Sequence, residues 1–218
     1  EQLYLNLSSL NILGRIYIAE EGINAQISVP EMNEQDFIKY LSSIPLLKNI
    51  MLKRAIEEGA SFYKLQVKVK KEIVAYDINS NQYDINDVGE HLSPSEFNKA
   101  IEDPNSVIVD IRNYYESEVG RFENAVIPDV DRSKELLPKI KKILKGKEKN
   151  KILLYCTGGI RCEKASSFLL KNNFEDVNQL EGGIINYAKE VKEKKIESKF
   201  KGKNFVFDNR MGERVTSD

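Results

Sequence analysis

Three observations predict an α/β protein with two domains. The chain has 218 residues, which is enough for two modest hydrophobic cores. Patterns typical of helices and strands follow one another over residues 1–75 in the order helix, strand, strand, helix, strand, strand. From residue 93 onward, apolar strand patterns alternate with amphipathic helices, which is the arrangement of a parallel sheet.

The first domain is expected to hold two helices and four strands. In chain order we expect a helix over 1–12, strands over 14–19 and 25–29 joined by a turn at 20–24, a helix over 33–41, and strands over 50–54 and 64–70. In the last of these, lysines alternate with Leu and Val, so one face is predicted to be exposed. This order is that of a ferredoxin-like, acylphosphatase-like α/β sandwich whose first strand would precede Glu1. We therefore expect a truncated N-terminus.

A connector over 76–92, containing His91 as an ordinary residue before a helix, leads to the second domain over 93–193. That domain opens with Ser93 as N-cap, Pro94 in the first turn and Glu96 completing a capping box. Strands are then expected over 107–111, 151–155 and 176–180, and helices over 114–118, 134–144, 162–172 and 183–193. The tail over 194–218 is lysine-rich, and its Phe205-Val206-Phe207 segment is expected to dock on the second domain.

Composition excludes several classes of protein. The 33 basic and 34 acidic residues give a net charge of −1, so there is no global basic field for nucleic acid. No apolar run reaches the roughly 20 residues of a transmembrane helix, and the sequence shows no signal peptide pattern. Two cysteines and one histidine are too few for a structural zinc site, and closely spaced thiols suit the reducing cytoplasm.

The lysines nevertheless gather in three segments. These are Lys64, Lys68, Lys70 and Lys71, then seven lysines over 139–151, then six over 192–203. A solvated face explains each segment equally well as a surface that contacts phosphates. Lys64, Lys68 and Lys70 are the first candidates for phosphate contacts, since they share the exposed face of one predicted strand.

Both cysteines lie in one glycine-rich segment between a predicted strand and a predicted helix. It reads Cys156, Thr157, Gly158, Gly159, Ile160, Arg161 and Cys162. The glycines can adopt positive φ and let backbone N–H groups converge, and the following helix directs its positive end to the same point. The segment therefore predicts a cradle that binds anions and stabilises a thiolate.

Cys156 is the candidate nucleophile, because it follows strand 151–155 where sites of parallel sheets lie, and its pKa is expected to be lowered. Arg161 is expected either to complete the loop or to hold an anion. Cys162 is either a resolving thiol for Cys156 or a buried residue of the first helical turn. Packing alone would make Cys156 a small hydrophobe at a strand end, but it does not explain the glycines and Arg161.

With its flanking motifs this segment resembles the six-residue active-site loop of rhodanese-like sulfur-handling domains. Cysteine phosphatases place arginine six positions after cysteine, whereas Arg161 stands five after Cys156. The strand ending in Asp110-x-Arg112, with a glutamate after it, fits the same family. Residues 120–128 resemble its Gly-His-Ile-x-x-Ala motif with arginine in place of histidine, and residues 180–187 resemble its closing Gly-Gly and helix. The resemblance implies a persulfide on Cys156, with Asp110 and Arg112 in supporting roles.

The whole chain resembles a narrower family, the bacterial rhodanese-domain proteins that act as tRNA uridine(34) hydroxylases. The match lies in the Gly-Arg-Ile-x-x-Ala-Glu-Glu-Gly-Ile-Asn segment over 14–24, the stretch over 70–74, the Cys156 loop, and the Phe-Val-Phe-Asp-x-Arg tail. The resemblance implies 5-hydroxylation of the anticodon uridine with molecular oxygen as co-substrate and tRNA as partner. No flavin motif and no iron-binding triad is visible in the sequence. Two other functions stay open: a plain sulfurtransferase, and a non-catalytic adaptor for RNA or protein.

Overall fold

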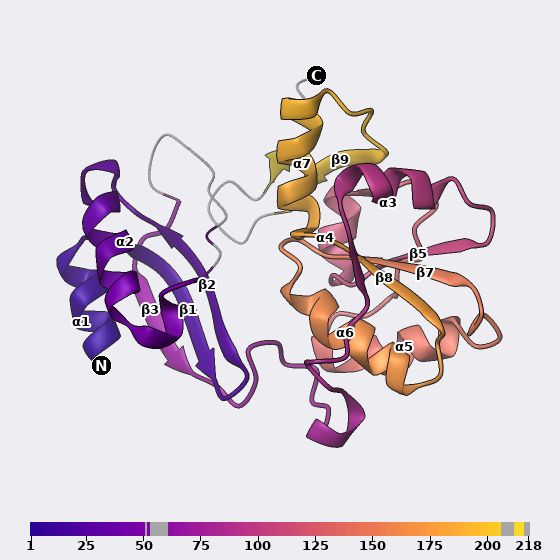
Figure 1. Ribbon diagram of the computed structural model, residues 1–218, viewed down its shortest axis with the longest axis horizontal. Coiled ribbons are helices and arrows are strands. Elements are labelled where there is room, and N and C mark those ends of the chain that lie inside the picture. The colour runs from indigo at the N-terminus through magenta and orange to yellow at the C-terminus, as the bar shows by residue number, and fades with distance from the viewer. Residues whose placement is uncertain (51, 53–60, 206–211, 216–218) are drawn as a thin grey trace. The chain divides into compact units, whose positions relative to one another are not determined.

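The computed structural model describes residues 1–50, 52, 61–205 and 212–215 (Figure 1). The described residues divide into two compact units, one over residues 1–73 and the other over residues 74–205 and 212–215. Both units are mixed α/β structures, as the sequence predicts.

The first unit is a three-stranded sheet with two helices on one face (Figure 1). Its elements are α1 (Gln2–Ser9), β1 (Leu13–Ala19), β2 (Gly22–Ser28), α2 (Glu34–Ser43) and β3 (Leu65–Val69). β1 lies in the middle, antiparallel to β2 and parallel to β3. The core consists of buried residues from both layers: Leu7, Ile12, Ile16 and Phe37.

Two strand predictions in this unit need correction. The second strand begins at Gly22 rather than at residue 25, because Ala19 pairs directly with Gly22 and leaves a two-residue turn. Gly22 accommodates this tight return with a φ of 140°. Of the predicted strand 50–54, the described residues Ile50 and Leu52 are not in a strand, and the rest lies outside the described residues.

The alternation predicted for segment 64–70 holds only in part. Leu65 and Val67 are half-buried and Lys68 is exposed, but Val69 is also 83% exposed. Lys68 and Val69 are successive residues that point to opposite faces of the sheet, so the end of β3 is exposed on both faces. Lys64 and Lys70 lie immediately before and after the strand and are exposed.

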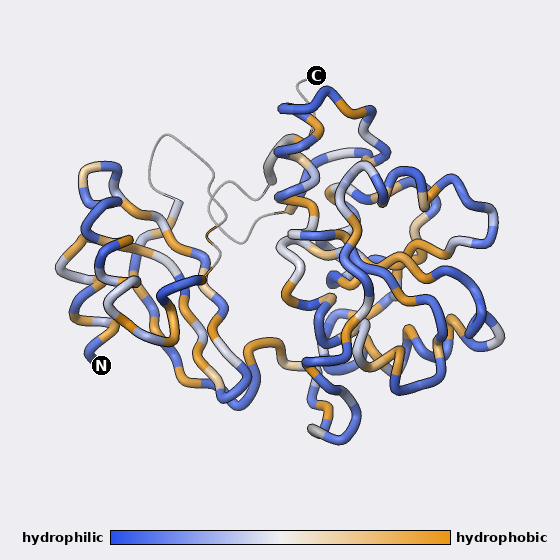
Figure 2. Tube along the Cα trace, viewed as in Figure 1, coloured by the Kyte–Doolittle hydropathy of each residue, from blue (hydrophilic) through white to orange (hydrophobic). Residues whose placement is uncertain are grey.

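The second unit is built on a four-stranded parallel sheet. The strands are β4 (Glu90–Leu92), β5 (Ser106–Asp110), β7 (Lys151–Tyr155) and β8 (Asp176–Leu180), in the order β4-β8-β7-β5. Figure 1 shows α3 (Pro94–Ile101) and α7 (Gly183–Lys194) on one side of this sheet, and α5 (Ser133–Ile143) and α6 (Ile160–Lys171) on the other. Figure 2 shows hydrophobic stretches on the strands at the centre of this unit. The sequence predicts the three long strands within one residue, whereas β4 falls in the predicted connector.

Several residues of that predicted connector pack against α6. Tyr76 is buried, and the Ser167 hydroxyl donates to the Asp84 carbonyl at 2.7 Å. The Gly89 N–H donates to the Ser166 hydroxyl at 2.9 Å. The Lys164 ammonium is buried too, and lies 4.7 Å from the centre of the Tyr83 ring. These contacts make residues 74–89 a packed part of the second unit.

The C-terminal segment of the chain adds two strands beside β6 (Gly120–Phe122) of the second unit. β9 (Phe200–Asn204) pairs antiparallel with β6, and β10 (Glu213–Arg214) pairs with β9. The Phe122 ring of β6 lies among four aromatic rings at centroid distances of 4.8–5.3 Å: Phe97, Tyr155, Tyr187 and Phe200. The tail therefore docks mainly through β9. Within the predicted docking segment, Phe205 contacts the Tyr115 ring, and 206–207 lie outside the described residues.

Candidate active site

Cys156 follows β7 directly, at the carboxyl end of the parallel sheet. α6 begins at Ile160, two residues earlier than predicted, so the loop itself is Cys156–Gly159 and Arg161 belongs to the first helical turn. Gly159 has a φ of 95°, and its N–H donates to the Cys156 sulfur at 3.1 Å. The expectation of positive φ is wrong for Gly158, because one left-handed residue is enough to turn the chain into the helix.

The loop keeps Cys156 as a thiolate at neutral pH. Burial of the side chain alone would raise the pKa of Cys156. Hydrogen bonds from the Cys162 thiol and backbone N–H, the nearby Arg161 charge and the Gly159 N–H outweigh it and lower the pKa from 9.0 to about 5. The thiolate is fully buried.

Cys162 lies in the first turn of α6 and is also fully buried. Burial and the hydrogen bond to Cys156 raise the pKa of Cys162 well above its ordinary value. Both cysteines are free thiols rather than a disulfide. The site thus holds one anionic and one protonated sulfur side by side.

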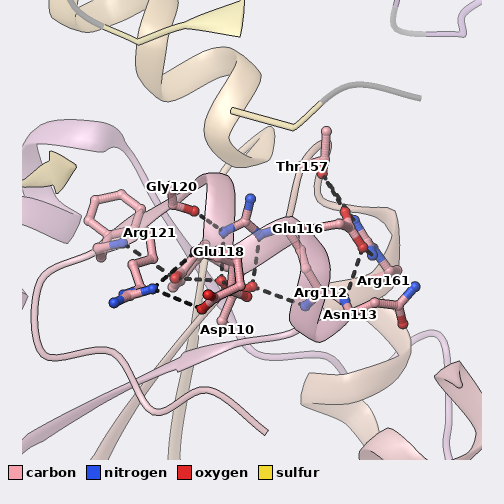
Figure 3. A network of polar contacts seen from close by, with 12 residues as sticks. Asp110, Arg112, Asn113, Glu116, Glu118, Gly120, Arg121, Thr157 and Arg161 are labelled. Atoms are coloured by element: carbon pink, nitrogen blue, oxygen red, sulfur yellow. Dashed lines mark hydrogen bonds and ion pairs between the residues drawn. The ribbon is translucent and has the colours of Figure 1, made fainter. Parts of the chain in front are cut away.

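Arg161 points toward a carboxylate of α4 (Tyr114–Val119), as Figure 3 shows. Its Nη1 and Nη2 donate to the two carboxylate oxygens of Glu116 at 2.7 and 2.8 Å. Nη2 also donates to the Thr157 hydroxyl at 3.0 Å. Of the two roles expected for Arg161, this geometry matches completion of the loop, because Glu116 already accepts from both terminal nitrogens along one edge of the guanidinium.

Glu116 and Tyr76 are the site residues that the sequence did not indicate as such. Glu116 is 0% exposed and also accepts from the Asn113 N–H at 3.0 Å, which caps α4. The Tyr76 hydroxyl donates to the Arg161 carbonyl at 3.2 Å. Burial raises the pKa of Tyr76 well above its ordinary value, so this hydroxyl stays a donor. The resemblance to rhodanese loops was the available signal for Glu116, and nothing local marked Tyr76.

The Gly182-Gly183 pair lets the start of α7 pack closely against the Cys156 loop. Gly183 has a φ of 67°, and a Cβ atom there would lie 2.5 Å from the Cys156 carbonyl oxygen. The N–H groups of Ile184 and Ile185 donate to the carbonyls of Cys156 and Thr157 at 2.9 and 3.1 Å. Glycine is therefore required at 183 for α7 to approach the loop this closely.

Asp110 and Arg112 form a separate buried network (Figure 3). The Arg112 Nε and Nη2 donate to the Asp110 carboxylate at 2.9 and 2.6 Å, and Nη2 also donates to the Gly120 carbonyl at 2.6 Å. The hydroxyls of Ser117 and Tyr155 donate to the same carboxylate at 2.8 and 2.7 Å. This network fastens β5, α4 and β6 to one another, which fixes the helix that carries Glu116.

The remaining candidates lie elsewhere. Lys64, Lys68 and Lys70 belong to the first unit, where the Lys70 ammonium lies 5.5 Å from the centre of the Tyr17 ring. His91 lies in β4, not merely before a helix, and its Nε2 is 2.8 Å from a Glu163 carboxylate oxygen. Among the described residues there is no group of three or more His, Cys, Asp or Glu side chains placed to hold a metal ion. In the same part of the chain, no helix is both long and apolar enough to cross a membrane.

Comparison with known proteins assigns both units. Residues 1–73 match the UPF0176 acylphosphatase-like domain, and residues 93–190 match the rhodanese-like domain. A Leptospira interrogans protein named tRNA uridine(34) hydroxylase is 53% identical over 219 residues, covering 100% of this chain and 60% of the relative. An Enterobacter protein of the same name is 47% identical over 220 residues, covering 100% of this chain and 63% of the relative.

Over its whole length the chain is therefore similar to proteins named tRNA uridine(34) hydroxylase. It spans about 60% of the length of the curated hydroxylases that it matches. A solved rhodanese-like domain from Anabaena is 18% identical, with a TM-score of 0.40, over 51% of this chain and 78% of that domain. The predicted fold class, an acylphosphatase-like domain followed by a rhodanese-like domain, is confirmed.

Proposed function

We propose that this chain carries the catalytic site of a tRNA uridine(34) hydroxylase, which places an oxygen atom from O2 on C5 of the anticodon uridine. One observation carries the proposal: a preformed thiolate at Cys156, in a chain 53% identical over 219 residues to a relative of that name. Its substrate would be tRNA, encountered in the cytoplasm.

Cys156 is the proposed reactive group. A pKa of about 5 leaves nearly all of it anionic at neutral pH, and the thiolate is the nucleophilic form of cysteine. The Gly159 N–H at 3.1 Å can also hold the charge of a persulfide in the same cradle. Thr157, Gly158 and Ile160 would shape the loop, and Arg161 would hold it to Glu116.

The overall change defines what an assay must contain. Insertion of one oxygen atom into the C5–H bond leaves the second oxygen atom of O2 to depart as water. That departure takes up two electrons and two protons, so a reductant must accompany O2. O2 is the proposed co-substrate. An assay with purified components must therefore also contain a reductant, such as a thiol.

The proposed contacts to tRNA are Lys64, Lys68 and Lys70, which are exposed on and beside β3. Exposed Tyr63, adjacent to Lys64, adds an aromatic ring of the kind on which unpaired bases stack. The target base lies in a single-stranded loop of tRNA, where bases are accessible to protein sites.

The second candidate is a rhodanese-type sulfurtransferase, favoured by the N–H donor that points at the Cys156 sulfur. In that reaction the thiolate attacks the sulfane sulfur of thiosulfate. A Cys156 S–S bond forms, the S–S bond of the donor breaks, and sulfite leaves with the electron pair. A second nucleophile such as cyanide then removes the outer sulfur and regenerates the thiolate.

One experiment separates the two candidates. The chain, its Cys156→Ser variant and a Glu118→Gln control are produced in a bacterial strain that lacks its own hydroxylase, and tRNA nucleosides are analysed by mass spectrometry. We expect 5-hydroxyuridine with the parent chain and the control, and none with Cys156→Ser. Thiosulfate:cyanide turnover without 5-hydroxyuridine would instead favour the sulfurtransferase. Full function in the Cys156→Ser variant would contradict the role of Cys156 and favour the adaptor.

A further inference from the structure

The three-stranded sheet of the first unit has a face turned away from its two helices (Figure 1). Ile16 and Ile18 of β1 belong to the core on the helix side, so Tyr17 between them points to the other side. The strand pairing places alternate residues of all three strands beside it. This surface, here called the polar face, consists of every second residue of β1 from Leu13 and of β2 from Gly22, together with Gln66 and Lys68 of β3.

The charge on the polar face is positive, although the whole chain has a net charge of −1. None of its residues is acidic, and it carries Arg15 and Lys68. Lys64 and Lys70 continue the alternation of β3 at its two ends, where the Gly14 N–H donates to the Lys64 carbonyl and the Lys70 N–H donates to the Ile18 carbonyl. Lys64, Lys68 and Lys70 are all exposed. The polar face is therefore complementary to the phosphates of a nucleic acid.

Tyr17 lies on the central strand of this face. It pairs with Asn24 of β2 on one side and with Lys68 of β3 on the other. The ring is half-buried, and the Lys70 ammonium lies over it at 5.5 Å from the ring centre, so a group on this side of the sheet can lie against the ring. A cation on an exposed ring contributes less than a stacked base, and Lys70 has a flexible side chain. A base can therefore take its place on Tyr17.

Amide side chains surround the tyrosine. Asn24 is directly opposite Tyr17, and such pairs have Cβ atoms about 5 Å apart. Gln26 and Gln66 occupy the corresponding positions on either side of Arg15. Each amide offers both a donor and an acceptor, which the edge of an unpaired base requires. One face thus presents a ring for stacking, amides for base edges and lysines for phosphates, which is the combination that single-stranded RNA needs.

We propose that the polar face of the first unit binds single-stranded RNA, with Tyr17 as the residue on which an unpaired base stacks. The inference rests on the proposed function only in naming tRNA as the source of that RNA. It adds a contact of a different kind to the lysines, because stacking involves no phosphate and its contribution does not depend on counterion release.

The first test measures RNA binding by Tyr17→Leu and Tyr17→Phe in the full chain. The probes are a fluorescein-labelled anticodon stem-loop and a duplex RNA of equal charge, and the readout is fluorescence anisotropy at several salt concentrations. Tyr4→Leu is the matched control, because Tyr4 is 44% exposed but lies on α1 in the helix layer. Circular dichroism and thermal unfolding check that each variant folds.

We expect Tyr17→Leu to weaken binding of the stem-loop by about 5-fold to 100-fold, the usual loss when one stacked aromatic ring is removed. The slope of log affinity against log salt should stay that of the parent chain, because no charge is removed. Tyr17→Phe keeps the ring and should bind like the parent chain, as should Tyr4→Leu. Duplex binding should not change in any of the variants, since its bases are already stacked.

A second test detects the stacking itself. The chain contains no tryptophan, so Tyr17→Trp introduces a single indole at the proposed position. Stacking of a base on this ring should quench its fluorescence as the stem-loop is added, with the same midpoint as the anisotropy titration. Tyr4→Trp places the single indole on α1 and should show no quenching.

Parent-like affinity in Tyr17→Leu would overturn the proposal, and so would equal quenching in Tyr17→Trp and Tyr4→Trp. A loss of affinity with a shallower salt slope would also count against it, because that result would trace the loss to the lysines. Failure of the parent chain to bind the stem-loop would refute it outright. Since no readout involves Cys156 or 5-hydroxyuridine, failure of the hydroxylation assay would leave a positive stacking result standing.

Discussion

Arg161 and Glu116 form a two-pronged ion pair beside the Cys156 loop, with Nη–Oε distances of 2.7 and 2.8 Å. Glu116 is fully buried and the Arg161 side chain is 13% exposed, so little water screens the pair. The loop arginine is therefore balanced by a carboxylate from a different helix. Its main effect is to fix the first turn of α6 against α4, and with it the position of the thiolate.

Replacing Glu116 by alanine should destabilise the second unit strongly. The substitution leaves the Arg161 charge buried without a partner, and removal of one member of a buried pair costs about 3–5 kcal/mol. Urea unfolding measures the loss. Glu118→Ala is the matched control on the same helix, because Glu118 is 52% exposed, and it should change the free energy of unfolding by less than about 0.5 kcal/mol. Equal losses in the two variants would contradict a stabilising ion pair.

Gly183→Ala should disrupt the Cys156 loop. Its Cβ atom would lie 2.5 Å from the Cys156 carbonyl oxygen and 2.7 Å from that of Thr157, at a φ of 67°. We expect a loss of stability together with slower labelling of Cys156. Gly146→Ala is the control, because Gly146 also has positive φ but no atom lies within 4 Å of its Cβ position. The control should cost only the backbone strain, about 1 kcal/mol.

Stability should depend on pH through Cys156. Its folded pKa of about 5 lies below the ordinary 9.0, so the unfolded chain binds the proton more tightly between these values. The stabilisation is complete above pH 9 and is lost as the pH falls toward 5. Unfolding free energies of the parent chain should therefore fall relative to those of Cys156→Ser as the pH is lowered through this range. A constant difference between the two proteins would show that the thiolate is not stabilised by folding.

Reversing Lys64, Lys68 and Lys70 to glutamate should weaken tRNA binding if the proposed function holds. For every phosphate that a lysine no longer neutralises, the slope of log affinity against log salt should become shallower by about 0.7–0.9. Filter binding or fluorescence anisotropy at several salt concentrations measures this slope. The control reverses Lys141, Lys142 and Lys145, which are exposed in and after α5. An unchanged slope in the first variant would show that this surface is only solvated.

Short-range patterns in the sequence predict much of this structure. β7 follows from a compact run of strand-forming residues, and α3 begins with the capping box expected from Ser93 and Glu96. The Cys156 loop is equally local, because only three positions separate Cys156 from the Gly159 N–H that donates to its sulfur. Features that depend on a few adjacent residues can therefore be predicted from the sequence.

Features that join distant residues were not predictable in the same way. Glu116 and Arg161 are 45 residues apart, and Glu116 alone looks like an ordinary helix-capping carboxylate. Tyr76 reaches Arg161 across 85 residues from a segment with no regular hydrophobic period. β4 has three residues, and its pairing with β8 rather than its own sequence makes it a strand.

The pairing of β9 with β6 decides where the rhodanese-like domain can be cut. Phe200 packs on Phe122, and Val215, just after β10, is 1% exposed. The family match ends at residue 190, so a shortened protein that stops there would leave Phe122 without one of its four ring neighbours and the outer edge of β6 unpaired. Such an edge invites association between chains. Any minimal soluble version of this domain should therefore extend through residue 215.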